Sequence, residues 1–418
     1  MDLLRFATAG SVDDGKSTLI GRLLHDSKQI FEDQLAAVAA SSRKRGHEGV
    51  DLALLTDGLR AEREQGITID VAYRYFATPN RKFIIADTPG HAQYTRNMVT
   101  GASTADLAVV LVDAAHGLRE QSRRHAYVAS LLGIRHIVLA VNKMDLVDWS
   151  ESVFDDIVAA FLEFSASLDL QVTPIPMSAL RGDNVVDPSV EMPWYKGPAL
   201  LSYLEDVRLD DVAPAAKPGR FPIQWVVKPR PGSSESRGYA GSIASGVFAP
   251  GDDVVILPSG LRTTIASIAT FDGELDAASA PRAIRMTFVD ELDIGRGDLV
   301  APVDDAPEVT NSFDATVCWM DGAPLRSGAR YLLKHTTRTT PVLVRELVHR
   351  TDVDTLVAEP AETLDINEIG LVRLQSATEL ALDPYREHRT TGSFILIDEA
   401  TNATVGAGLV RERATLGA

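Results

Sequence analysis

Near its amino terminus the chain reads Gly10-Ser11-Val12-Asp13-Asp14-Gly15-Lys16-Ser17-Thr18. The first eight of these residues fit the phosphate-loop pattern G-x-x-x-x-G-K-[ST]. The apolar run Leu3–Ala9 before the motif predicts a strand, and Ser17–Leu24 predicts a helix, which is the context that the motif requires. The alternative is a glycine-containing turn between a strand and a helix that holds no ligand. The stretch therefore favours an α/β nucleotide-binding domain of the P-loop type.

Each part of this loop has a role in holding phosphate. The glycines let successive backbone N–H groups turn inward, and the N-terminus of the following helix adds partial positive charge. Lys16 is expected to reach the β- and γ-phosphates, which makes it a candidate catalytic residue, and the Ser17 hydroxyl is a candidate ligand of Mg²⁺. We therefore expect all of Gly10–Thr18 to contribute to nucleotide binding.

A second motif, Asp87-Thr88-Pro89-Gly90-His91, follows the predicted strand Lys82–Ala86. An aspartate at the carboxyl end of a parallel strand can hold Mg²⁺ through water. Gly90 can bring its N–H group close to a γ-phosphate. By itself the segment is equally consistent with a polar turn. Downstream of a phosphate loop, it indicates a second element of the same site, with Asp87 and Gly90 binding the nucleotide and its metal ion.

The choice of base depends on Asn142-Lys143-Met144-Asp145, which ends another predicted strand. The Asp145 carboxylate has only acceptors, so it fits the adjacent N1–H and exocyclic amine of guanine, whereas N1 of adenine is itself an acceptor. The aliphatic stem of Lys143 can cover the plane of the base. After the next strand, Ser178-Ala179-Leu180 is expected to close the pocket with backbone N–H groups. These residues indicate guanine and argue against an ATPase of the same loop class.

Between the phosphate loop and Asp87 lies Gln65-Gly66-Ile67-Thr68-Ile69. We expect Thr68 to bind Mg²⁺ only when the γ-phosphate is present, so that its segment orders and releases as a switch and contributes to catalysis. An edge strand is the alternative, because Ile67, Ile69 and Val71 alternate with polar residues. Both interpretations can hold in different nucleotide states.

The first half of the chain alternates strand-like and helix-like segments. The predicted strands are Leu3–Ala9, Lys82–Ala86, Leu107–Val112, Ile137–Val141 and Gln171–Pro176, and the predicted helices include Ser17–Leu24, Glu120–Leu132 and Ser152–Ser167. A further alanine-rich helix is predicted over Leu35–Ala40. Strands separated by helices imply right-handed crossovers and a mostly parallel sheet. We therefore predict an α/β P-loop GTPase domain over residues 1–212.

The second half changes to short β-rich segments after a linker rich in proline and alanine at residues 213–219. A second break falls near residues 301–307. Predicted strands include Gln224–Lys228, Ser242–Gly246, Asp253–Leu257, Thr263–Ile268, Asp314–Trp319, Val342–Arg350, Ile369–Leu374 and Gly392–Ile397, with a hairpin turn at Pro258-Ser259-Gly260. Runs of this length fit two small all-β barrel domains, which we place at residues 213–305 and 306–418.

The composition excludes several classes of protein. The 418 residues carry a net charge of −17, with 45% hydrophobic and 24% charged residues, as in ordinary globular chains. The single cysteine excludes a disulfide framework and a Cys-rich metal site. No apolar run is long enough to cross a bilayer, and the start lacks a signal-peptide pattern. We expect a cytoplasmic protein that binds neither membrane nor nucleic acid.

The five motifs, in their order and spacing, resemble those of the translation-factor class of GTPases. Within that class the chain is most similar to the large, GTP-hydrolysing subunit of the heterodimeric bacterial sulfate adenylyltransferase, also called ATP sulfurylase. The segments that carry this resemblance are Arg5–Ser17, Met192–Pro198, Arg237–Gly241, Gly392–Asp398 and Thr401–Gly408. The resemblance thus runs from the first strand nearly to the last residues.

This resemblance implies an enzyme that binds GTP or GDP with Mg²⁺ and hydrolyses GTP. Hydrolysis would drive a small, ATP-binding catalytic subunit to join ATP and sulfate into adenosine 5′-phosphosulfate and pyrophosphate, the first step of sulfate assimilation. The two subunits would form a heterodimer or a higher assembly. His91 occupies the position at which GTPases of this class orient the attacking water, and Gly117, Gln121 and His125 match a helix that follows the switch region.

A competing hypothesis is an elongation-factor-like GTPase that delivers aminoacyl-tRNA, since one GTPase domain followed by two barrels is the same architecture. Against it stands Asp14, where elongation factors carry His or Ser, together with the Met192–Pro198 segment and the tail. Two further points stay open. Trp194 and Tyr195 are either packing residues or part of an interface, and the basic run Arg43–Arg45 is either a solvated face or a contact with the partner. At Ser236 this sequence departs from the family, which often has an aromatic residue at that position.

Overall fold

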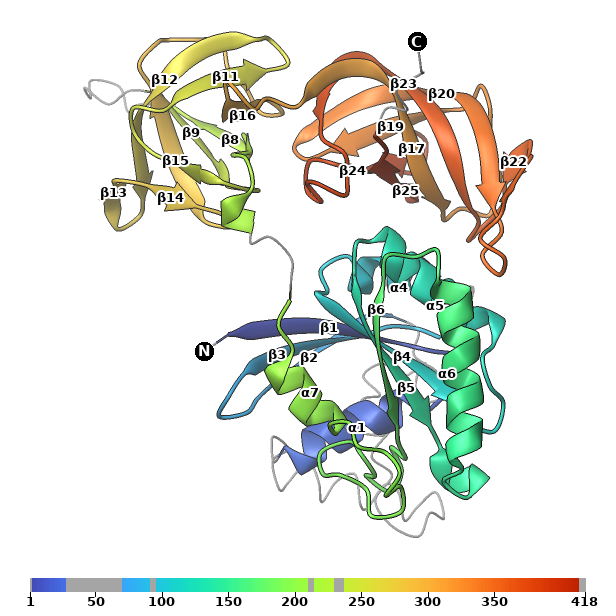
Figure 1. The fold of residues 1–418 in the computed structure, drawn as a ribbon. Coiled ribbons are helices and arrows are strands. Elements are labelled where there is room, and N and C mark those ends of the chain that lie inside the picture. The colour runs from blue at the N-terminus through green and yellow to red at the C-terminus, as the bar shows by residue number, and fades with distance from the viewer. Residues whose placement is uncertain (1, 28–69, 91–94, 210–213, 229–236, 413–418) are drawn as a thin grey trace. The chain divides into compact units, whose positions relative to one another are not determined.

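The computed structural model describes residues 2–27, 70–90, 95–209, 214–228 and 237–412 (Figure 1). Predictions that concern Leu35–Ala40, Arg43–Arg45, Gln65–Ile69 with Thr68, His91 and Ser236 lie outside these residues. The chain divides into two compact units, residues 1–209 with 353–356 and residues 210–352 with 357–418.

The first unit is built on one six-stranded sheet. Its strands are, in spatial order, β2 (Ala72–Ala77), β3 (Lys82–Asp87), β1 (Leu3–Ala9), β4 (Leu107–Asp113), β5 (His136–Asn142) and β6 (Gln171–Pro176). Each neighbouring pair from β3 to β6 is parallel, and only the edge strand β2 is antiparallel to β3. The predicted mostly parallel sheet is confirmed.

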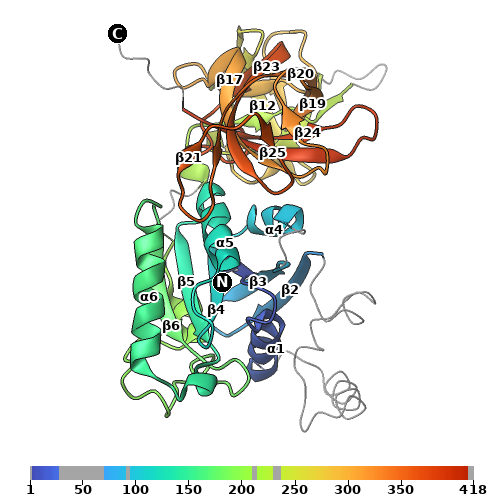
Figure 2. The same ribbon diagram turned by 90° about the vertical axis from the view of Figure 1, so that its right-hand side faces the viewer.

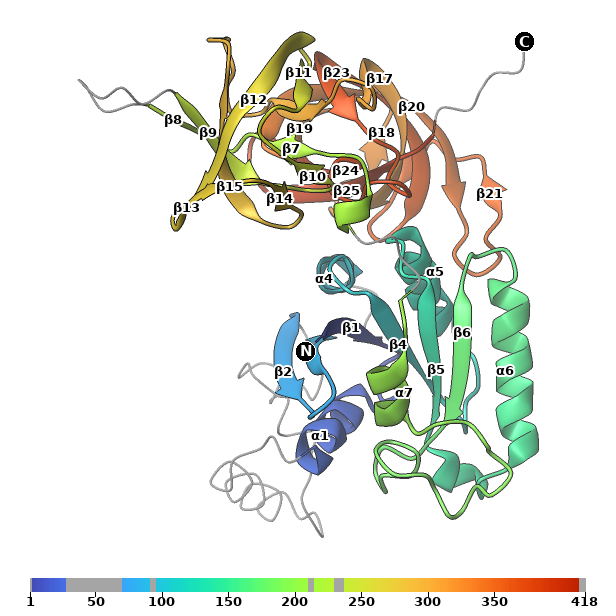
Figure 3. The ribbon, with the colours of Figure 1, turned by 60° about the vertical axis from the view of Figure 1, so that its left-hand side comes forward.

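Helices cover both faces of this sheet. They are α1 (Lys16–Asp26), α4 (Thr95–Ala102), α5 (Glu120–Leu131), α6 (Glu151–Ser165) and α7 (Leu200–Asp206). Helices α1 and α7 lie on one side of the sheet and α6 on the other (Figure 3), and α6 runs alongside β5 and β6 (Figure 2). Because both faces are covered, β4 and β5 are buried along their whole length and read as continuous apolar runs.

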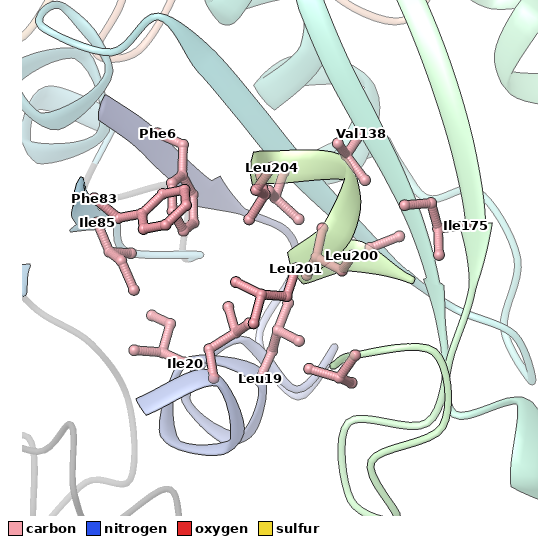
Figure 4. Packing of buried hydrophobic residues seen from close by; sticks show 14 of the residues in the cluster. Phe6, Leu19, Ile20, Phe83, Ile85, Val138, Ile175, Leu200, Leu201 and Leu204 are labelled. Atoms are coloured by element: carbon pink, nitrogen blue, oxygen red, sulfur yellow. The ribbon is translucent and has the colours of Figure 1, made fainter. Parts of the chain in front are cut away.

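The core on the α1 and α7 side joins the start of the sequence to the end of the unit. Leu19 and Ile20 of α1 and the three leucines of α7 converge on Phe6, Phe83 and Ile85 of the sheet (Figure 4). All of these side chains are buried. This packing fixes α1 against the sheet, and the phosphate loop is the short connection between β1 and α1.

Element types were predicted well in this unit, and their ends shift by one or two residues. Three elements were missed, namely β2, α4 and α7. Two of them are short helices of 7–8 residues, which give too few turns for a clear apolar period. The third, β2, exposes Tyr73 and Tyr75 on its outer face and is an edge strand.

The described residues of the second unit form two large antiparallel sheets and two small strand pairs. The first runs β7 (Phe221–Pro222), β16 (Leu299–Pro302), β11 (Asp253–Leu257), β12 (Leu261–Thr270), β15 (Ala283–Phe288), β9 (Gly238–Ser242) and β8 (Trp225–Val227), with β13 (Gly273–Leu275) on β12. Strands β7 and β8 stand at the two ends of this strand order and follow each other directly in the chain. The sheet therefore closes into a barrel. The predicted hairpin at residues 258–260 joins β11 to β12.

One predicted strand in this barrel is wrong. The strand lies at Gly238–Ser242 instead of Ser242–Gly246. The chain turns at Gly246, which has a positive φ of 77°, and a Cβ there would lie 2.4 Å from the Cα of Gly219. Strands β10 (Val247–Phe248) and β14 (Ala278–Ser279) form a small separate pair.

The second sheet of this unit runs β19 (Arg330–His335), β24 (Ser393–Ile397), β25 (Thr404–Val410), β17 (Glu308–Trp319), β23 (Ile369–Leu382), β20 (Arg338–Thr351) and β21 (Ala358–Glu359). A further pairing of β19 with β20 closes it into a barrel around Trp319, which is fully buried. Strands β18 (Leu325–Arg326) and β22 (Thr363–Leu364) pair beside it. Two all-β barrels after an α/β domain confirm the predicted fold class.

The two barrels are joined by a buried ion pair. Arg220 of the first barrel region donates from Nε and Nη2 to the two carboxylate oxygens of Asp383, at 3.0 and 3.1 Å. Both side chains are under 5% exposed. Thr391 also donates to this carboxylate at 2.5 Å. A buried pair of this kind is stable only when its hydrogen bonds are complete, as they are here.

Two features are absent from the described residues. Among them, no helix is long and apolar enough to cross a membrane. The same part of the chain contains no group of three or more His, Cys, Asp or Glu side chains that could hold a metal ion by themselves.

Candidate functional site

The predicted motif residues gather at one edge of the parallel sheet, because each follows the carboxyl end of a strand. The phosphate loop follows β1, Asp87 ends β3, Asn142 ends β5, and Ser178 comes shortly after β6. The strand register pairs Thr8 with Asp87 and Asp113 with Asn142, so these strand ends are level with one another. Ligands of open α/β sheets bind at this edge.

The phosphate loop has the backbone conformation of an anion-binding turn. Asp13 has φ 70° and Gly15 has φ 92°, both in the left-handed region. A Cβ at Gly15 would lie 2.5 Å from Nδ2 of Asn142, so glycine is required there for space as well as for conformation. The loop then enters α1 at Lys16, with its N–H groups at the N-terminus of an 11-residue helix.

The Lys16 ammonium is buried and held by the loop itself. It donates to the carbonyl oxygens of Gly10 at 2.8 Å and Ser11 at 2.9 Å. An ammonium has three donors, and two of them are used by these carbonyls of the described residues. Burial lowers the pKa of Lys16, while the nearby carboxylates of Asp87 and Asp14 act in the opposite direction.

Asp14 is a buried carboxylate inside the loop. Its Oδ2 accepts the backbone N–H of Ser11 at 2.5 Å, and only 2% of the residue is exposed. Burial raises the pKa of Asp14, and the hydrogen bond from Ser11 and the charge of Lys16 offset this only in part. Asp14, the residue that departs from the elongation-factor pattern, therefore stabilises the loop by accepting a hydrogen bond inside it.

The second motif approaches the phosphate loop closely. A Cβ at Gly90 would lie 2.4 Å from Nζ of Lys16 and 2.5 Å from the carbonyl oxygen of Gly10, so no side chain fits at this position. Asp87 is 2% exposed and accepts from the Thr8 hydroxyl at 3.4 Å. The Thr88 hydroxyl in turn donates to the Thr8 carbonyl at 2.6 Å. The structure thus brings Asp87 and Gly90 together with Lys16.

Asn142 joins the phosphate loop to the segment after β6. Its Nδ2 donates to the Asp14 carbonyl at 2.7 Å, and its Oδ1 accepts the Ala179 N–H at 2.9 Å. The Ser178 N–H is bonded to the Asp183 carbonyl at 3.2 Å. The sequence led us to expect both of these amides at the pocket. In the structure both amides donate hydrogen bonds to other groups of the protein.

Lys143 and Asp145 lie on either side of the turn that follows β5. Lys143 has φ 62° and donates from Nζ to Oδ2 of Asp113 at 2.8 Å. The Asp145 side chain is 10% exposed, and its Oδ2 lies 3.9 Å from Nε of Arg181. The Arg181 guanidinium lies over the Trp149 ring, 5.1 Å from its centroid.

Asp113 and Thr8 were missed in the sequence. A signal for Asp113 existed, because it directly follows the apolar strand Leu107–Val112, as Asp87 follows Lys82–Ala86. No such signal marks Thr8, a polar residue within an apolar run whose role depends on the neighbouring strand.

The remaining predicted residues fall into three groups. Val12, Ser17 and Thr18 lie in the loop and the first turn of α1 and are partly exposed. His91 and Thr68 lie outside the described residues. On α5, His125 is 4% exposed, and burial followed by repulsion from Lys16 lowers its pKa to about 3, so it is neutral at physiological pH. Its Nδ1 and Oε1 of Gln121 have no hydrogen-bond partner among the described residues.

The open question about Trp194 and Tyr195 is answered in part by packing. The Trp194 ring packs in a tilted orientation against the Phe154 ring, with the ring centroids 5.4 Å apart, and its Nε1 donates to the Trp149 carbonyl at 3.0 Å. Tyr195 packs against the core of the first unit and donates to the carbonyl of Pro198 at 3.2 Å. Burial raises the pKa of Tyr195 to about 12. Both rings are therefore packing residues within this unit.

Family models and relatives of known name match most of the chain. Residues 1–212 match the family described as "Elongation factor Tu GTP binding domain", and residues 312–411 match "GTP-eEF1A C-terminal domain-like". The bifunctional enzyme CysN/CysC of Mycobacterium tuberculosis is 58% identical, over 98% of this chain and 67% of the relative. Sulfate adenylyltransferase subunit 1 of Teredinibacter turnerae is 53% identical, over 98% and 88%. A solved structure of sup35 complexed with GDP matches with a TM-score of 0.44 and 23% identity, over 99% and 94%.

These relatives decide between the two hypotheses about function. Sulfate adenylyltransferase subunit 1 of Teredinibacter turnerae matches nearly the whole chain at more than half identity, so the aminoacyl-tRNA hypothesis is not favoured. Guanine nucleotide binding follows from the domain that matches residues 1–212. The chain belongs to the sulfate adenylyltransferase subunit 1 family, within the GTPases that carry the elongation factor Tu GTP binding domain.

Proposed function

We propose that this chain is the GTP-hydrolysing subunit of a sulfate adenylyltransferase. It converts GTP and water into GDP and phosphate and uses this reaction to drive a partner. The partner is a small, ATP-binding catalytic subunit that forms adenosine 5′-phosphosulfate and pyrophosphate from ATP and sulfate. The product contains a sulfate–phosphate anhydride, whose formation is uphill, and a coupled hydrolysis supplies the driving force.

The observation that carries this proposal is the double hydrogen bond of Asn142. One side chain holds both the phosphate loop, through the Asp14 carbonyl, and the base loop, through the Ala179 N–H. The two halves of a nucleotide site are thereby set at a fixed separation. Asp145, three residues after Asn142, is then placed to accept the N1–H and amine of guanine, as its charge and position favour.

The phosphates are held by this chain in the following way. The N–H groups of the loop and of the first turn of α1 donate to the phosphate oxygens, and the Lys16 ammonium adds positive charge. The close approach of Gly90 to Lys16 supports a place for its N–H beside the γ-phosphate. These donors stabilise the charge that develops as the terminal phosphoryl group is transferred to water.

The oxygen donors near the phosphates fit Mg²⁺. Asp87 offers a buried carboxylate next to Lys16, and Ser17 offers a hydroxyl at the start of α1. Hard oxygen ligands of this kind suit Mg²⁺, and the family resemblance adds the Thr68 hydroxyl. When bound, the ion neutralises charge on the β- and γ-phosphates.

The roles of His91 and Thr68 rest on the family resemblance. His91 orients the attacking water, and Thr68 belongs to a switch that orders with the γ-phosphate. We place the protein in the cytoplasm as part of a heterodimer or a higher assembly. We divide it into a GTPase domain at residues 1–212 and barrels at 213–305 and 306–418.

Co-purification with the small subunit tests the proposal. The complex should form adenosine 5′-phosphosulfate from ATP and sulfate, and GTP should increase the yield. The Lys16→Ala variant should form the same complex but lose both GTP hydrolysis and the GTP-dependent yield. Full synthesis by this chain without a partner would contradict the proposed division of labour.

A further inference from the structure

Asp113 is a buried carboxylate at the carboxyl end of β4 that belongs to none of the five nucleotide motifs. Its side chain is 4% exposed. It accepts from Nζ of Lys143 at 2.8 Å and from the N–H of Ala115 at 2.9 Å, and it lies 3.0 Å from Nδ1 of His116. Burial acts to raise its pKa, but these partners outweigh burial and hold the pKa of Asp113 below its ordinary value. The carboxylate is therefore ionised and fixed in place.

Lys143 is constrained at both ends by this arrangement. The Lys143 backbone lies in the left-handed region, with φ 62°, a conformation that residues other than glycine rarely adopt. Its ammonium is bonded to Asp113, which lies on the neighbouring strand and pairs in register with Asn142. The four methylene groups between these two points are therefore limited to few conformations, although the Lys143 side chain is 28% exposed.

We propose that Asp113 is a positioning residue that holds the Lys143 stem over the plane of the guanine base. This inference rests on the proposed function and on the expectation from the sequence that the Lys143 stem covers the base. A lysine side chain loses much rotamer freedom when it packs on a ligand, and an anchor that removes this freedom beforehand reduces the loss on binding. Asp113 acts through Lys143 and needs no contact with the nucleotide.

Loss of the Lys143 anchor and loss of a contact at the edge of the base should have different effects on nucleotide affinity. The stem of Lys143 covers the face of the base, whereas Asp145 reads N1–H and the exocyclic amine at its edge. Inosine diphosphate has the same face as GDP but lacks the amine. Loss of the anchor should therefore weaken both nucleotides by the same factor, and the ratio of their affinities should not change.

The first experiment measures GDP and inosine diphosphate affinities of the full chain and its Asp113→Asn variant. Asparagine keeps the shape and the acceptor for Ala115 but loses the charge. Both dissociation constants should rise roughly tenfold, the expected loss for a charge-assisted hydrogen bond. The matched control is Asp169→Asn, which removes an exposed carboxylate that pairs with Arg135 at 2.6 Å in the same unit, and it should change neither constant. Unchanged GDP affinity in Asp113→Asn, or a loss confined to GDP, would overturn the proposal.

A second variant decides the matter even if Asp113→Asn does not fold. Lys143→Met keeps an apolar side chain that can cover the base but has no ammonium to anchor. It should lose affinity for GDP by a similar factor, and Asp113→Asn should cost nothing further in the Lys143→Met background. Retained affinity in Lys143→Met, or additive losses in the double variant, would show that the anchor is not used. A wild-type chain that bound no GDP would instead contradict the proposed function.

Discussion

The side chain of Asn142 donates a 2.7 Å hydrogen bond to the backbone carbonyl of Asp14. These residues are 128 positions apart in the sequence, and the bond is buried. It ties the end of β5 to the phosphate loop after β1, across the intervening strand β4. The phosphate loop and the segment predicted to bind the base are thus joined by a buried hydrogen bond.

Replacing Asn142 with Ala should disturb both halves of this site. The variant leaves the buried N–H of Ala179 and the carbonyl of Asp14 without their partner, at a cost of about 1–3 kcal/mol for each unsatisfied group. We expect GDP affinity to fall at least tenfold, as measured by displacement of a fluorescent GDP analogue. A variant that binds GDP as tightly as the wild type would show that Asn142 is not the link between the halves.

Asp145→Asn should change which base is preferred. The asparagine amide would meet the exocyclic amine of guanine donor to donor, whereas xanthine has an acceptor at that position. We expect GTP affinity to fall by roughly a hundredfold or more and xanthosine triphosphate affinity to rise. Competition between the two nucleotides measures this directly. Equal GTP affinity in the variant and the wild type would mean that the base pocket is wrongly assigned.

Asp14→Asn should stabilise the protein in a pH-dependent way. The folded-state pKa of Asp14 is raised because of burial, so its folded state binds the proton more tightly than its unfolded state. Its contribution to stability is therefore complete below the unfolded pKa of 3.8 and is lost as the pH rises through the folded-state pKa. Asparagine has no such loss and keeps an acceptor for Ser11.

Thermal unfolding of both proteins over a series of pH values measures this effect. The difference in Tm, variant minus wild type, should grow as the pH rises above 4 and then become constant. A difference that is independent of pH over this range would show that Asp14 titrates in the folded protein as it does in the unfolded chain.

Arg220→Ala should destabilise the second unit strongly. It leaves the Asp383 carboxylate buried with Thr391 but without its guanidinium, a loss of about 3–5 kcal/mol for a broken buried pair. Chemical denaturation monitored by tryptophan fluorescence measures the change. The double variant Arg220→Met, Asp383→Leu removes both charges and should recover much of the stability. If the single and double variants were equally unstable, the loss would come from packing and not from the unpaired charge.

The sequence predicted most of the fold of the first unit because its signals are local. Buried parallel strands read as apolar runs, and the glycines and lysine of the phosphate loop mark the turn between β1 and α1. The missed elements had weak local signals. The misplaced strand at Ser242–Gly246 was decided by a turn at Gly246 that packs against Gly219, a contact that the local pattern does not contain.

For the site, the sequence by itself determined which residue types follow the strand ends. These residue types were enough to predict the phosphate loop, the preference for guanine and the family. The tertiary structure alone decided how these residues bond to each other. It placed the Asn142 side chain between Asp14 and Ala179, and it paired Lys143 with Asp113. It likewise engaged the amides of Ser178 and Ala179 within the protein. The physical reason is strand register: only the hydrogen-bonded alignment of parallel strands makes distant strand ends level, and a partner 128 residues away leaves no trace in a local pattern.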